Sequence, residues 1–492
     1  MSIVVNEIRA GFYLDSVALM RLSRQARDLD GVVDAGLMIG TPANLQILRD
    51  AGLLSVVGER AGPGDLVIAL RVQDDAAGSA ALTALKGELD RPRRAAAKAS
   101  GWAPRTLRGA LAADPALDLA LISVPGDFAT AEAWKALSRG LNVMIFSDNV
   151  SVEDEIALKA EGRAKGLFVM GPDCGTAIIG GVPLAFANAV PRGDIGIVGA
   201  SGTGIQEVSC LVAHAGHGVS HAIGTGGRDL SGEVGAVTTL MAIEALAGDP
   251  GTTSLLLVSK PPERRVAERV LAALGASGKP AVVCFLGASG DIAVPKNCRL
   301  AATLEEAAAL ATGREITAPP APGDRRPGKS IRGLFAGGTM CAEAQVVLHG
   351  RGLAVASNVP VPGAASEATA TSGGHVVIDL GDDEFTRGRP HPMIEPSVRD
   401  APLAAALADA SVGVVLLDLV LGYGGHLDPA AAIADVLAAS TGSVRPVIIA
   451  SVTGTEQDPQ VRSAQVAKLT AAGVIVAPSN ATAARLAAAV VG

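Results

Sequence analysis

The sequence is poor in basic charge, long apolar runs and aromatic residues. These shortages limit the kinds of protein and of partner that we expect. The formal net charge is −8 over 492 residues, aromatic residues make up 2%, and no apolar run is long enough to span a bilayer. A nucleic-acid surface needs a basic face to neutralise phosphates, so we expect no nucleic-acid partner. The start of the chain also lacks the charged-then-apolar order of a signal peptide, so we expect a cytoplasmic protein with no membrane partner.

Cysteines with paired spacing are missing as well. Five cysteines are scattered along the chain, at Cys174, Cys210, Cys284, Cys298 and Cys341. This pattern predicts reduced thiols in the core or in loops, and it predicts neither a disulfide framework nor a zinc site. His214, His217 and His221 have near-helical spacing but no acidic or cysteine neighbour, which favours a helix C-terminus over a metal site.

Glycine and aliphatic residues are plentiful. There are 59 glycines, and hydrophobic residues make up 49% of the chain. Val, Ile and Ala line parallel strands and Gly opens the turns between layers, so this composition predicts an α/β fold. A chain of this length exceeds one hydrophobic core, and we expect three or four domains.

The first part of the chain predicts a small α/β domain over residues 1–86, of ferredoxin-like or ACT-like type. Its expected strands cover residues 2–8, 32–39 and 65–72, and its expected helices cover residues 15–29 and 41–51. Thr41-Pro42 is a typical helix start, since proline suits the first helical position.

The middle of the chain has a sequence pattern typical of parallel α/β structure, and we expect a linker on either side of it. Residues 87–109 are basic and poorly periodic, and residues 314–330 are proline-rich, so we expect a linker at each. Residues 110–190 alternate strands and helices, with a helix opened by Ser151, but lack the opening strand and Gly-rich turn of a complete dinucleotide fold. They predict a truncated Rossmann-like domain.

An internal repeat is the most informative feature. The segment Gly196-Ile-Val-Gly-Ala-Ser-Gly-Thr matches Gly333-Leu-Phe-Ala-Gly-Gly-Thr with a one-residue gap, and each has Glu four residues after its Thr. The later strands and a final Ala-rich helix follow in the same order. We therefore predict two flavodoxin-like domains, residues 191–313 and 331–492, that arose by duplication.

The two matched turns predict an anion site. A strand that enters a helix through small residues leaves unpaired N–H groups at the positive end of the helix dipole, where phosphate, carboxylate or an oxyanion binds. The alternative is that the glycines only permit close packing. The candidate anion-binding residues are Ser201, Gly202, Thr203, Gly204, Gly337, Gly338 and Thr339.

Loops after the second strand of each repeat carry arginine beside flexible backbone. Arg228 follows Gly226 and Gly227 in the first repeat, and the second has Arg387, Arg389 and His391 within five positions. Arginine can grip phosphate or carboxylate with two hydrogen bonds, although solvated charge on a long loop is the alternative.

A further segment, Gly422-Tyr-Gly-Gly-His-Leu-Asp-Pro, follows an apolar strand and should emerge where ligands of α/β sheets bind. It supplies Tyr423 as a candidate substrate contact and His426 as a candidate acid, base or ligand donor. His426 can equally cap the helix that starts at Asp428-Pro429.

Several motifs carry a resemblance to a known family. The segment Gly171-Pro-Asp-Cys-Gly-Thr, followed by the first Gly-Thr turn, is similar to the sequence that joins the two domains of the succinyl-CoA synthetase α subunit. Residues 331–491 resemble the CoA-ligase domain of the β subunit. The sequence motifs resemble those of the FdrA family over nearly the whole chain. Besides the Gly-Pro-Asp-Cys-Gly-Thr segment, these motifs are Gly224-Thr-Gly-Gly-Arg-Asp-Leu, Gly337-Gly-Thr-Met-Cys-Ala-Glu-Ala-Gln and Ser451-Val-Thr-Gly-Thr-Glu-Gln-Asp-Pro-Gln. The resemblance makes 110–190 a CoA-binding-type domain and adds Asp173 and Cys174 to the substrate-binding candidates.

The chain departs from the ligases of that superfamily. They pass phosphate through a histidine in a loop that here reads Gly287-Ala-Ser-Gly-Asp-Ile-Ala-Val-Pro-Lys-Asn, without histidine. The opening CoA-binding turn is missing, and no ATP-grasp domain fits the remaining length. The resemblance therefore argues against a self-sufficient ADP-forming ligase.

For the FdrA family, the resemblance implies a subunit of an oxamate carbamoyltransferase in purine breakdown, which exchanges oxalurate and phosphate for oxamate and carbamoyl phosphate with partner subunits. Carbamoyl phosphate or an acyl phosphate would be a substrate, CoA is possible, and an oligomer is expected. In this reading Arg228, Arg387 or Arg389 orients a small carboxylate substrate, and His426 or His391 moves a proton. The alternatives are an acyl-CoA ligase or transferase subunit and a non-enzymatic, metabolite-sensing scaffold.

Overall fold

The computed structural model describes residues 2–12, 14, 16–90, 104, 106–288, 292–320, 328–367, 373–386, 390–440 and 445–492. They form two compact units. The first comprises Met1–Val143, Ser147–Val150 and Thr386–Pro390, and the second comprises Met144–Phe146, Ser151–Phe385 and His391–Gly492. Two predicted site residues, Arg387 and Arg389, lie outside the described residues.

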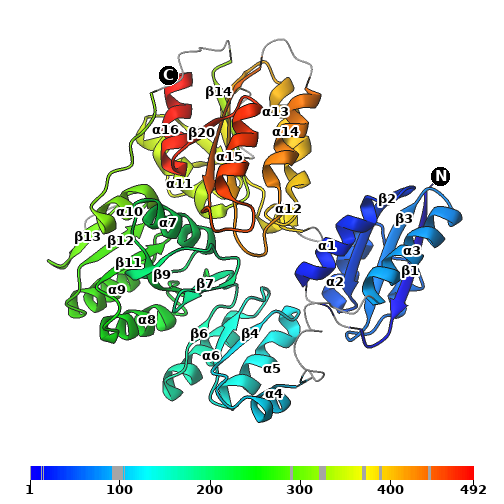
Figure 1. Ribbon diagram of the computed structural model, residues 1–492, viewed down its shortest axis with the longest axis horizontal. Helices are drawn as coiled ribbons and strands as arrows, with labels where there is room; N and C mark the ends of the chain where they lie inside the picture. The colour runs from blue at the N-terminus through cyan, green and yellow to red at the C-terminus, as the bar shows by residue number, and fades with distance from the viewer. Residues whose placement is uncertain are drawn as a thin grey trace. The chain divides into compact units, whose positions relative to one another are not determined.

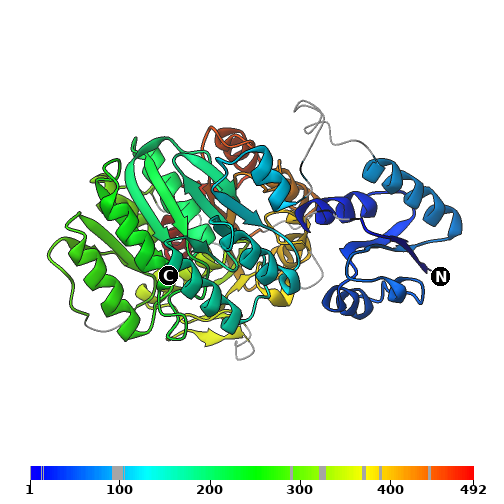
Figure 2. The ribbon, with the colours of Figure 1, turned by 90° about the horizontal axis from the view of Figure 1, so that it is seen from below.

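The N-terminal part of the first unit is built on one antiparallel sheet (blue in Figure 1 and Figure 2). Strands β1 (Ile3–Arg9), β2 (Val32–Ile39) and β3 (Leu66–Val72) lie in the order β1-β3-β2. Ile3 faces Val72 across the first pair, and both outer strands run opposite to β3. The three strands predicted from the sequence are confirmed within two residues.

Helices cover both faces of this sheet. Helices α1 (Ser16–Arg27) and α3 (Asp75–Asp90) pack on one face, and α2 (Pro42–Asp50) packs on the other with the short helix η1 (Gly58–Arg60) nearby. The hydroxyl of Thr41 accepts a hydrogen bond from the third residue of α2, which confirms the predicted helix start. Helix α3 has no counterpart in the sequence analysis. It extends through Asp90, so residues 87–90 are helical where a linker was expected.

Residues 107–170 alternate helices and short strands. The strands lie in the order β4-β5-β6, and Ser151 caps α6 as predicted. The bounds are α4 (Leu107–Ala113), β4 (Leu119–Ile122), α5 (Gly126–Leu137), β5 (Asn142–Ile145), α6 (Val152–Lys165) and β6 (Val169–Met170). Helix α4 starts inside residues 87–109, which were expected to be a linker.

The first repeat is a seven-stranded sheet in the order β13-β12-β11-β9-β10-β7-β8. Numbered from β9, its five parallel strands have the flavodoxin-like order 2-1-3-4-5, as predicted. The antiparallel hairpin β7–β8 joins this sheet through β10, so residues 176–185 belong to it although the sequence analysis assigned them to residues 110–190. The bounds are β7 (Thr176–Ile179), β8 (Val182–Ala185), β9 (Arg192–Gly199), α7 (Gly202–His214), β10 (Val219–Gly224), α8 (Val237–Gly248), β11 (Ser254–Ser259), α9 (Arg264–Ala276), β12 (Ala281–Phe285), β13 (Cys298–Leu300) and α10 (Leu304–Thr312).

The second repeat is a parallel sheet in the order β16-β15-β17-β14-β18-β19-β20. Its strands β17, β14, β18, β19 and β20 repeat the order 2-1-3-4-5, with β15 and β16 added at one edge. The bounds are β14 (Ser330–Phe335), α11 (Gly338–Gly350), β15 (Val355–Ser357), β16 (Ala365–Ser366), β17 (His375–Asp379), α12 (Asp383–Thr386), η4 (Pro396–Arg399), α13 (Asp400–Ala408), β18 (Val412–Val420), α14 (Pro429–Ala439), β19 (Val447–Thr453), α15 (Arg462–Ala471), β20 (Ile475–Ala477) and α16 (Asn480–Val491).

The two repeats pack through one helix layer each. Helices α7 and α10 of the first repeat meet α11 and α16 of the second, while α8 and α9, and α13 to α15, cover the outer faces of the two sheets (Figure 1). One continuous apolar core contains residues of all four inner helices and both sheets. Burying such a surface is the main force that holds the repeats together. The carboxyl ends of β9 and β14 therefore come together where α7 and α11 begin.

Candidate functional site

The two Gly-Thr turns predicted to bind an anion contact each other. The hydroxyl oxygens of Ser201 and Thr339 form a hydrogen bond between the repeats. The Cβ of Thr203 lies 3.2 Å from the position that a Cβ at Gly337 would occupy. The starts of α7 and α11, each with unpaired N–H groups and a positive dipole end, thus adjoin at one place.

The start of α7 is capped by its own hydroxyl. Ser201 is the N-cap, and its Oγ accepts the N–H of Gly204 at 3.0 Å. A Cβ at Gly204 would lie 2.8 Å from that same oxygen, so close packing explains this glycine. Thr203 lies in the first turn, and its hydroxyl makes no hydrogen bond to any residue of the described ranges. Ser201 therefore serves the fold, and the Thr203 hydroxyl is available to a ligand.

The start of α11 is held by a buried carboxylate that the sequence analysis overlooked. Asp418, in the strand read as apolar, is fully buried, and its Oδ1 and Oδ2 accept the N–H groups of Ala336 and Gly337 at 2.7 and 2.8 Å. Arg399 donates to Oδ1 at 2.7 Å. Burial raises the pKa of Asp418, while Arg399 and the two N–H groups act against this. The sequence did contain a signal for this role. Asp418 is the single acidic residue inside a nine-residue apolar strand, and a buried carboxyl group needs partners.

Asp418 decides what α11 can offer to a ligand. The two N–H groups that precede the helix are occupied, so an incoming anion has the first N–H groups of α11 itself. A Cβ at Gly338, the first helical residue, would lie 2.6 Å from Oδ2 of Asp379. The glycine therefore permits the close approach of a carboxyl group to the helix start.

His391 lies beside this carboxyl group. Its Nδ1 accepts the N–H of Met393 at 3.2 Å, so Nε2 carries the hydrogen of the neutral ring. Burial lowers the pKa of His391 to about 4, which keeps the ring neutral at neutral pH. Its Nε2 lies 2.6 Å from the position of a Cβ at Gly381, in the loop that follows Asp379. The predicted residue His391 thus lies close to the helix start, as a neutral donor.

The glutamate at the same position of each repeat has a reciprocal role. Glu207 of α7 accepts the backbone N–H of Asn480, the first residue of α16, at 3.2 Å, and the hydroxyl of Thr453. Glu343 of α11 accepts the backbone N–H of Leu304, the first residue of α10, at 2.7 Å. Each repeat therefore caps the last helix of the other. Burial is the main cause that raises both pKa values, that of Glu343 to about 8.

The loop around Arg228 packs on the cis-proline turn of residues 171–176. A Cβ at Gly226 would lie 2.3 Å from the carbonyl oxygen of Pro172, and one at Gly227 would lie 3.6 Å from Asp173. The structure thus brings two of the predicted substrate segments together. Close packing accounts for Gly226. Burial raises the pKa of Cys174 to about 12, which removes its thiolate from the chemistry.

Arg228 is engaged in a buried charge network. Its Nε donates to Glu155 at 3.0 Å, and Lys159 binds both Glu155 and Asp229 at 2.7 Å. Asp229 also accepts the N–H groups of Thr238 and Thr239 at the start of α8. The side chain of Arg228 is 43% exposed, so the guanidinium stays accessible to a ligand while its Nε is bound to Glu155.

His426 and Tyr423 lie in the loop after β18. The Nδ1 of His426 accepts the N–H of Asp428 at 3.1 Å, which matches the capping alternative for this histidine. Tyr423 is 44% exposed, and its N–H donates to the carbonyl oxygen of Ala187 at 2.9 Å. The tyrosine ring is therefore accessible, whereas the imidazole is tied to the start of α14.

The other histidines and cysteines take structural positions. His214 ends α7 as predicted, with Nε2 3.0 Å from the carbonyl oxygen of Gly454. His221 lies in strand β10, so the prediction of a helix C-terminus is wrong for this residue, and its Nδ1 accepts the N–H of Gly180. All five cysteines are buried and free. In the described part of the chain no group of three or more His, Cys, Asp or Glu residues is placed to hold a metal ion. None of the helices described there is long and apolar enough to cross a membrane.

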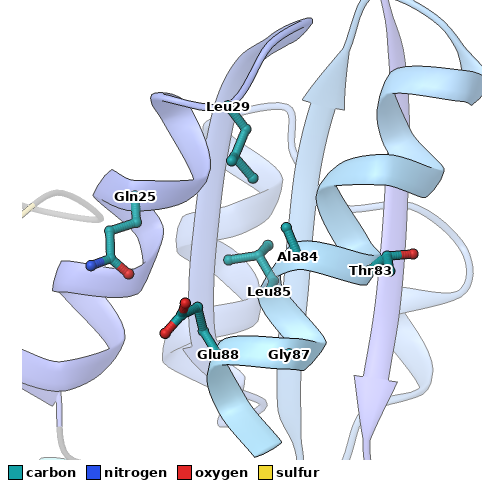
Figure 3. Close-up of a pocket in the computed structure, with 7 residues that line it drawn as sticks. All are labelled: Gln25, Leu29, Thr83, Ala84, Leu85, Gly87 and Glu88. Carbon is teal, nitrogen blue, oxygen red and sulfur yellow. The ribbon is translucent and has the colours of Figure 1, made fainter. Parts of the chain in front are cut away.

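A cavity of about 590 Å³, lined by none of the predicted site residues, lies between α1 and α3 of the first unit (Figure 3). Its walls are small or aliphatic apart from three polar side chains, and no basic residue lines it, so it does not resemble an anion site. The lining residues are Gln25, Leu29, Thr83, Ala84, Leu85, Gly87 and Glu88.

Family models match most of the chain. A model described as CoA-ligase matches residues 334–490, and one described as CoA binding domain matches residues 192–287. A third, described as "AllF, heavy metal-associated domain", matches residues 1–104, a stretch that contains neither cysteine nor histidine, the usual ligands of soft metals. The CoA-binding match lies on the first repeat, so a CoA-binding-type domain over residues 110–190 stays a prediction.

Curated proteins are similar over different lengths. The uncharacterized protein YahF of Escherichia coli (strain K12) is 41% identical over 495 residues, covering 96% of this chain and 96% of YahF. The ADP-forming sulfoacetate-CoA ligase subunit SqwL of an Acholeplasma species is 25% identical over 181 residues, covering 35% of this chain and 59% of SqwL. The ADP-forming succinate–CoA ligase subunit alpha 1 of Archaeoglobus fulgidus is 27% identical over 147 residues, covering 29% of this chain and 49% of that subunit.

Proposed function

The chain belongs to the same family as YahF of Escherichia coli and has succinyl-CoA synthetase-like CoA-binding and CoA-ligase domains, and on this premise we propose that it is a transferase subunit that moves a carbamoyl or acyl group to and from phosphate. The observation that carries the proposal is the meeting of two helix starts at Ser201 and Thr339. Two positive dipole ends at one place favour a multiply charged anion over a single carboxylate.

The chemistry at this point needs position and electrostatics more than a covalent nucleophile. The unpaired N–H groups of both helices and the hydroxyl of Thr203 hold the phosphate, and the same donors stabilise charge that develops on the transferred carbonyl group. His391 supplies a further neutral donor near the start of α11. The absence of histidine from residues 287–297 fits a reaction in which the enzyme is not phosphorylated.

The acceptor that we propose is oxamate. The resemblance to the FdrA family and the match of residues 1–104 to a model named for AllF both support the exchange of oxalurate and phosphate for oxamate and carbamoyl phosphate. A phosphate oxygen bonds to the carbamoyl carbon, the bond from that carbon to the oxamate nitrogen breaks, and the nitrogen takes up a proton. Arg228, Arg387 and Arg389 are the candidates for the oxamate carboxylate, with Tyr423 as a contact and His426 as a further proton donor.

A second candidate function is that of an acid–thiol ligase subunit. It is favoured by the matched CoA-binding and CoA-ligase models and by relatives named as subunits of ADP-forming CoA ligases. This chain would then take its nucleotide site, and the group that carries the phosphate, from partner chains.

One experiment separates the two functions. The full chain, purified with the subunits that associate with it, is incubated with carbamoyl phosphate and oxamate, and in parallel with ATP, CoA and oxamate. We expect release of phosphate together with oxalurate in the first mixture. Formation of ADP and a thioester in the second mixture, without oxalurate in the first, would refute the transferase proposal.

A further inference from the structure

A buried carboxyl group points at the start of α11 without a donor for one of its oxygens. Asp379 ends β17 and is 7% exposed, and its Oδ1 accepts the N–H of Gly381 at 2.9 Å. Its Oδ2 lies 2.6 Å from the position of a Cβ at Gly338. No residue in the described ranges donates a hydrogen bond to Oδ2. Oδ2 is not among the fully buried side-chain atoms that lack a partner in the described ranges, so water or a ligand can reach it beside the helix start.

Four titratable groups lie near Asp379, and three of them carry charge. Asp418 on β18 and Asp382 on the following loop disfavour its ionised form, and Lys260 after β11 favours it. The neutral ring of His391 lies close by and adds no charge. Burial is the largest cause and raises the pKa of Asp379 to about 7. The group can therefore gain or lose a proton near neutral pH.

An anion at the start of α11 and an ionised Asp379 exclude each other. Two negative charges a few ångströms apart, one of them on a buried carboxyl group, repel strongly. A protonated carboxyl group, in contrast, can donate its O–H to the anion and so supply the partner that Oδ2 lacks. We propose that Asp379 is protonated whenever the anion is bound, and that it is the proton carrier of the transfer. This inference rests on the proposed function.

In the proposed transfer, Asp379 is the only group of the protein that is needed to move protons. As the oxygen of monohydrogen phosphate bonds to the carbamoyl carbon, the bond to nitrogen breaks and its electron pair stays on nitrogen. Asp379 gives its proton to that nitrogen and regains one from the attacking phosphate. No oxidant, reductant or further reactant is needed, and the carboxyl group ends in its starting state, as a general acid–base requires.

The test uses sulfate, because sulfate keeps its charge between pH 6 and 8 whereas phosphate does not. Its affinity for the full chain is measured by calorimetry across this range for the unmodified protein, for Asp379→Asn and for the control Glu384→Gln. Glu384 is an exposed carboxylate in helix α12, which follows Asp379 in sequence. If only the protonated carboxyl group admits the anion, the affinity of the unmodified protein and of the control should fall about tenfold from pH 6 to 8.

Asp379→Asn should bind sulfate equally well at both pH values, because the amide also donates a hydrogen bond and cannot ionise. It should also lose transfer activity in kcat, with KM for phosphate little changed. A pH-independent affinity in the unmodified protein, or a pH dependence that survives in Asp379→Asn, would overturn the role of Asp379 and leave the anion site standing. No binding of sulfate at pH 6 would overturn the anion site itself, and with it the proposed function.

Discussion

At the start of α7 a hydroxyl caps the helix, whereas at the start of α11 a buried carboxylate holds the backbone. Ser201 provides the first cap and Asp418 provides the second, although the two turns match in sequence. The carboxylate brings negative charge to its helix start and the hydroxyl does not. The start of α7 in the first repeat therefore keeps the stronger positive electrostatic field. The second repeat supplies Asp379, the ionisable group that an acid–base reaction needs.

The largest effect should come from breaking the carboxylate anchor. Replacing Arg399 by Met leaves Asp418 buried without its cation, and losing one partner of a buried pair costs about 3–5 kcal/mol. We expect a correspondingly lower free energy of unfolding in chemical denaturation. The control is Arg264→Met, whose partner Glu268 is exposed, and where about 0.5 kcal/mol or less is expected. Equal losses in both variants would contradict the anchor.

A second effect should appear in the pH dependence of stability. The pKa of Glu343 is raised to about 8 by burial, so between its unfolded value of 4.5 and that value the folded state binds more protons than the unfolded state. The contribution of Glu343 to the free energy of unfolding is therefore fully present below about pH 4.5 and is lost as the pH rises to about 8. Glu343→Gln should flatten this decline in thermal melts.

The control for this pH effect is the exposed Glu384→Gln, which should keep the decline of the unmodified protein. The equivalent residue of the first repeat, Glu207, has a pKa raised in the same direction, so Glu207→Gln should flatten the curve as well. A curve that stays steep in both buried variants would show that other groups cause the decline.

A smaller effect should follow from removing the hydroxyl cap. Ser201→Ala loses the bond to the N–H of Gly204 and the bond to Thr339, and the loss of an N-cap hydroxyl costs about 1 kcal/mol. Thr303→Ala, which removes the side-chain cap of α10, is the matched control. We expect similar losses of Tm in both, but weaker phosphate binding only in Ser201→Ala, because the Oγ of Ser201 also holds Thr339 and so positions the two helix starts. Unchanged phosphate affinity in Ser201→Ala would separate the cap from the anion site.

The sequence predicted much of the architecture but little of what holds the site. Patterns that are local in the chain, such as the duplicated turn and the apolar strands, predicted two sheets in the order 2-1-3-4-5. The partners of Asp418 and of the two glutamates lie up to 273 residues away in sequence. No periodicity reports such pairs, so the glutamate of each turn was noticed and its role in capping the other repeat was not.

Asp379 shows the same limit in the candidate site. It stands just before the loop that carries Arg387, Arg389 and His391, but its ionisation depends on burial and on charges from β18 and from the residue after β11. The sequence instead favoured arginine and histidine, whose side chains are easy to recognise. Arg228 turned out to be bound to Glu155, and His426 to the start of α14.

The most direct test of the account is the affinity of Thr203→Val for phosphate, measured beside its thermal stability on the assembled protein. Valine keeps the shape of the side chain, and the hydroxyl makes no bond to the described residues that folding would lose. Losing a hydrogen bond to a charged ligand should weaken phosphate binding by about 1.5–3 kcal/mol, with Tm unchanged. Unchanged affinity, with or without a lower Tm, would contradict the claim that the paired helix starts bind the anion.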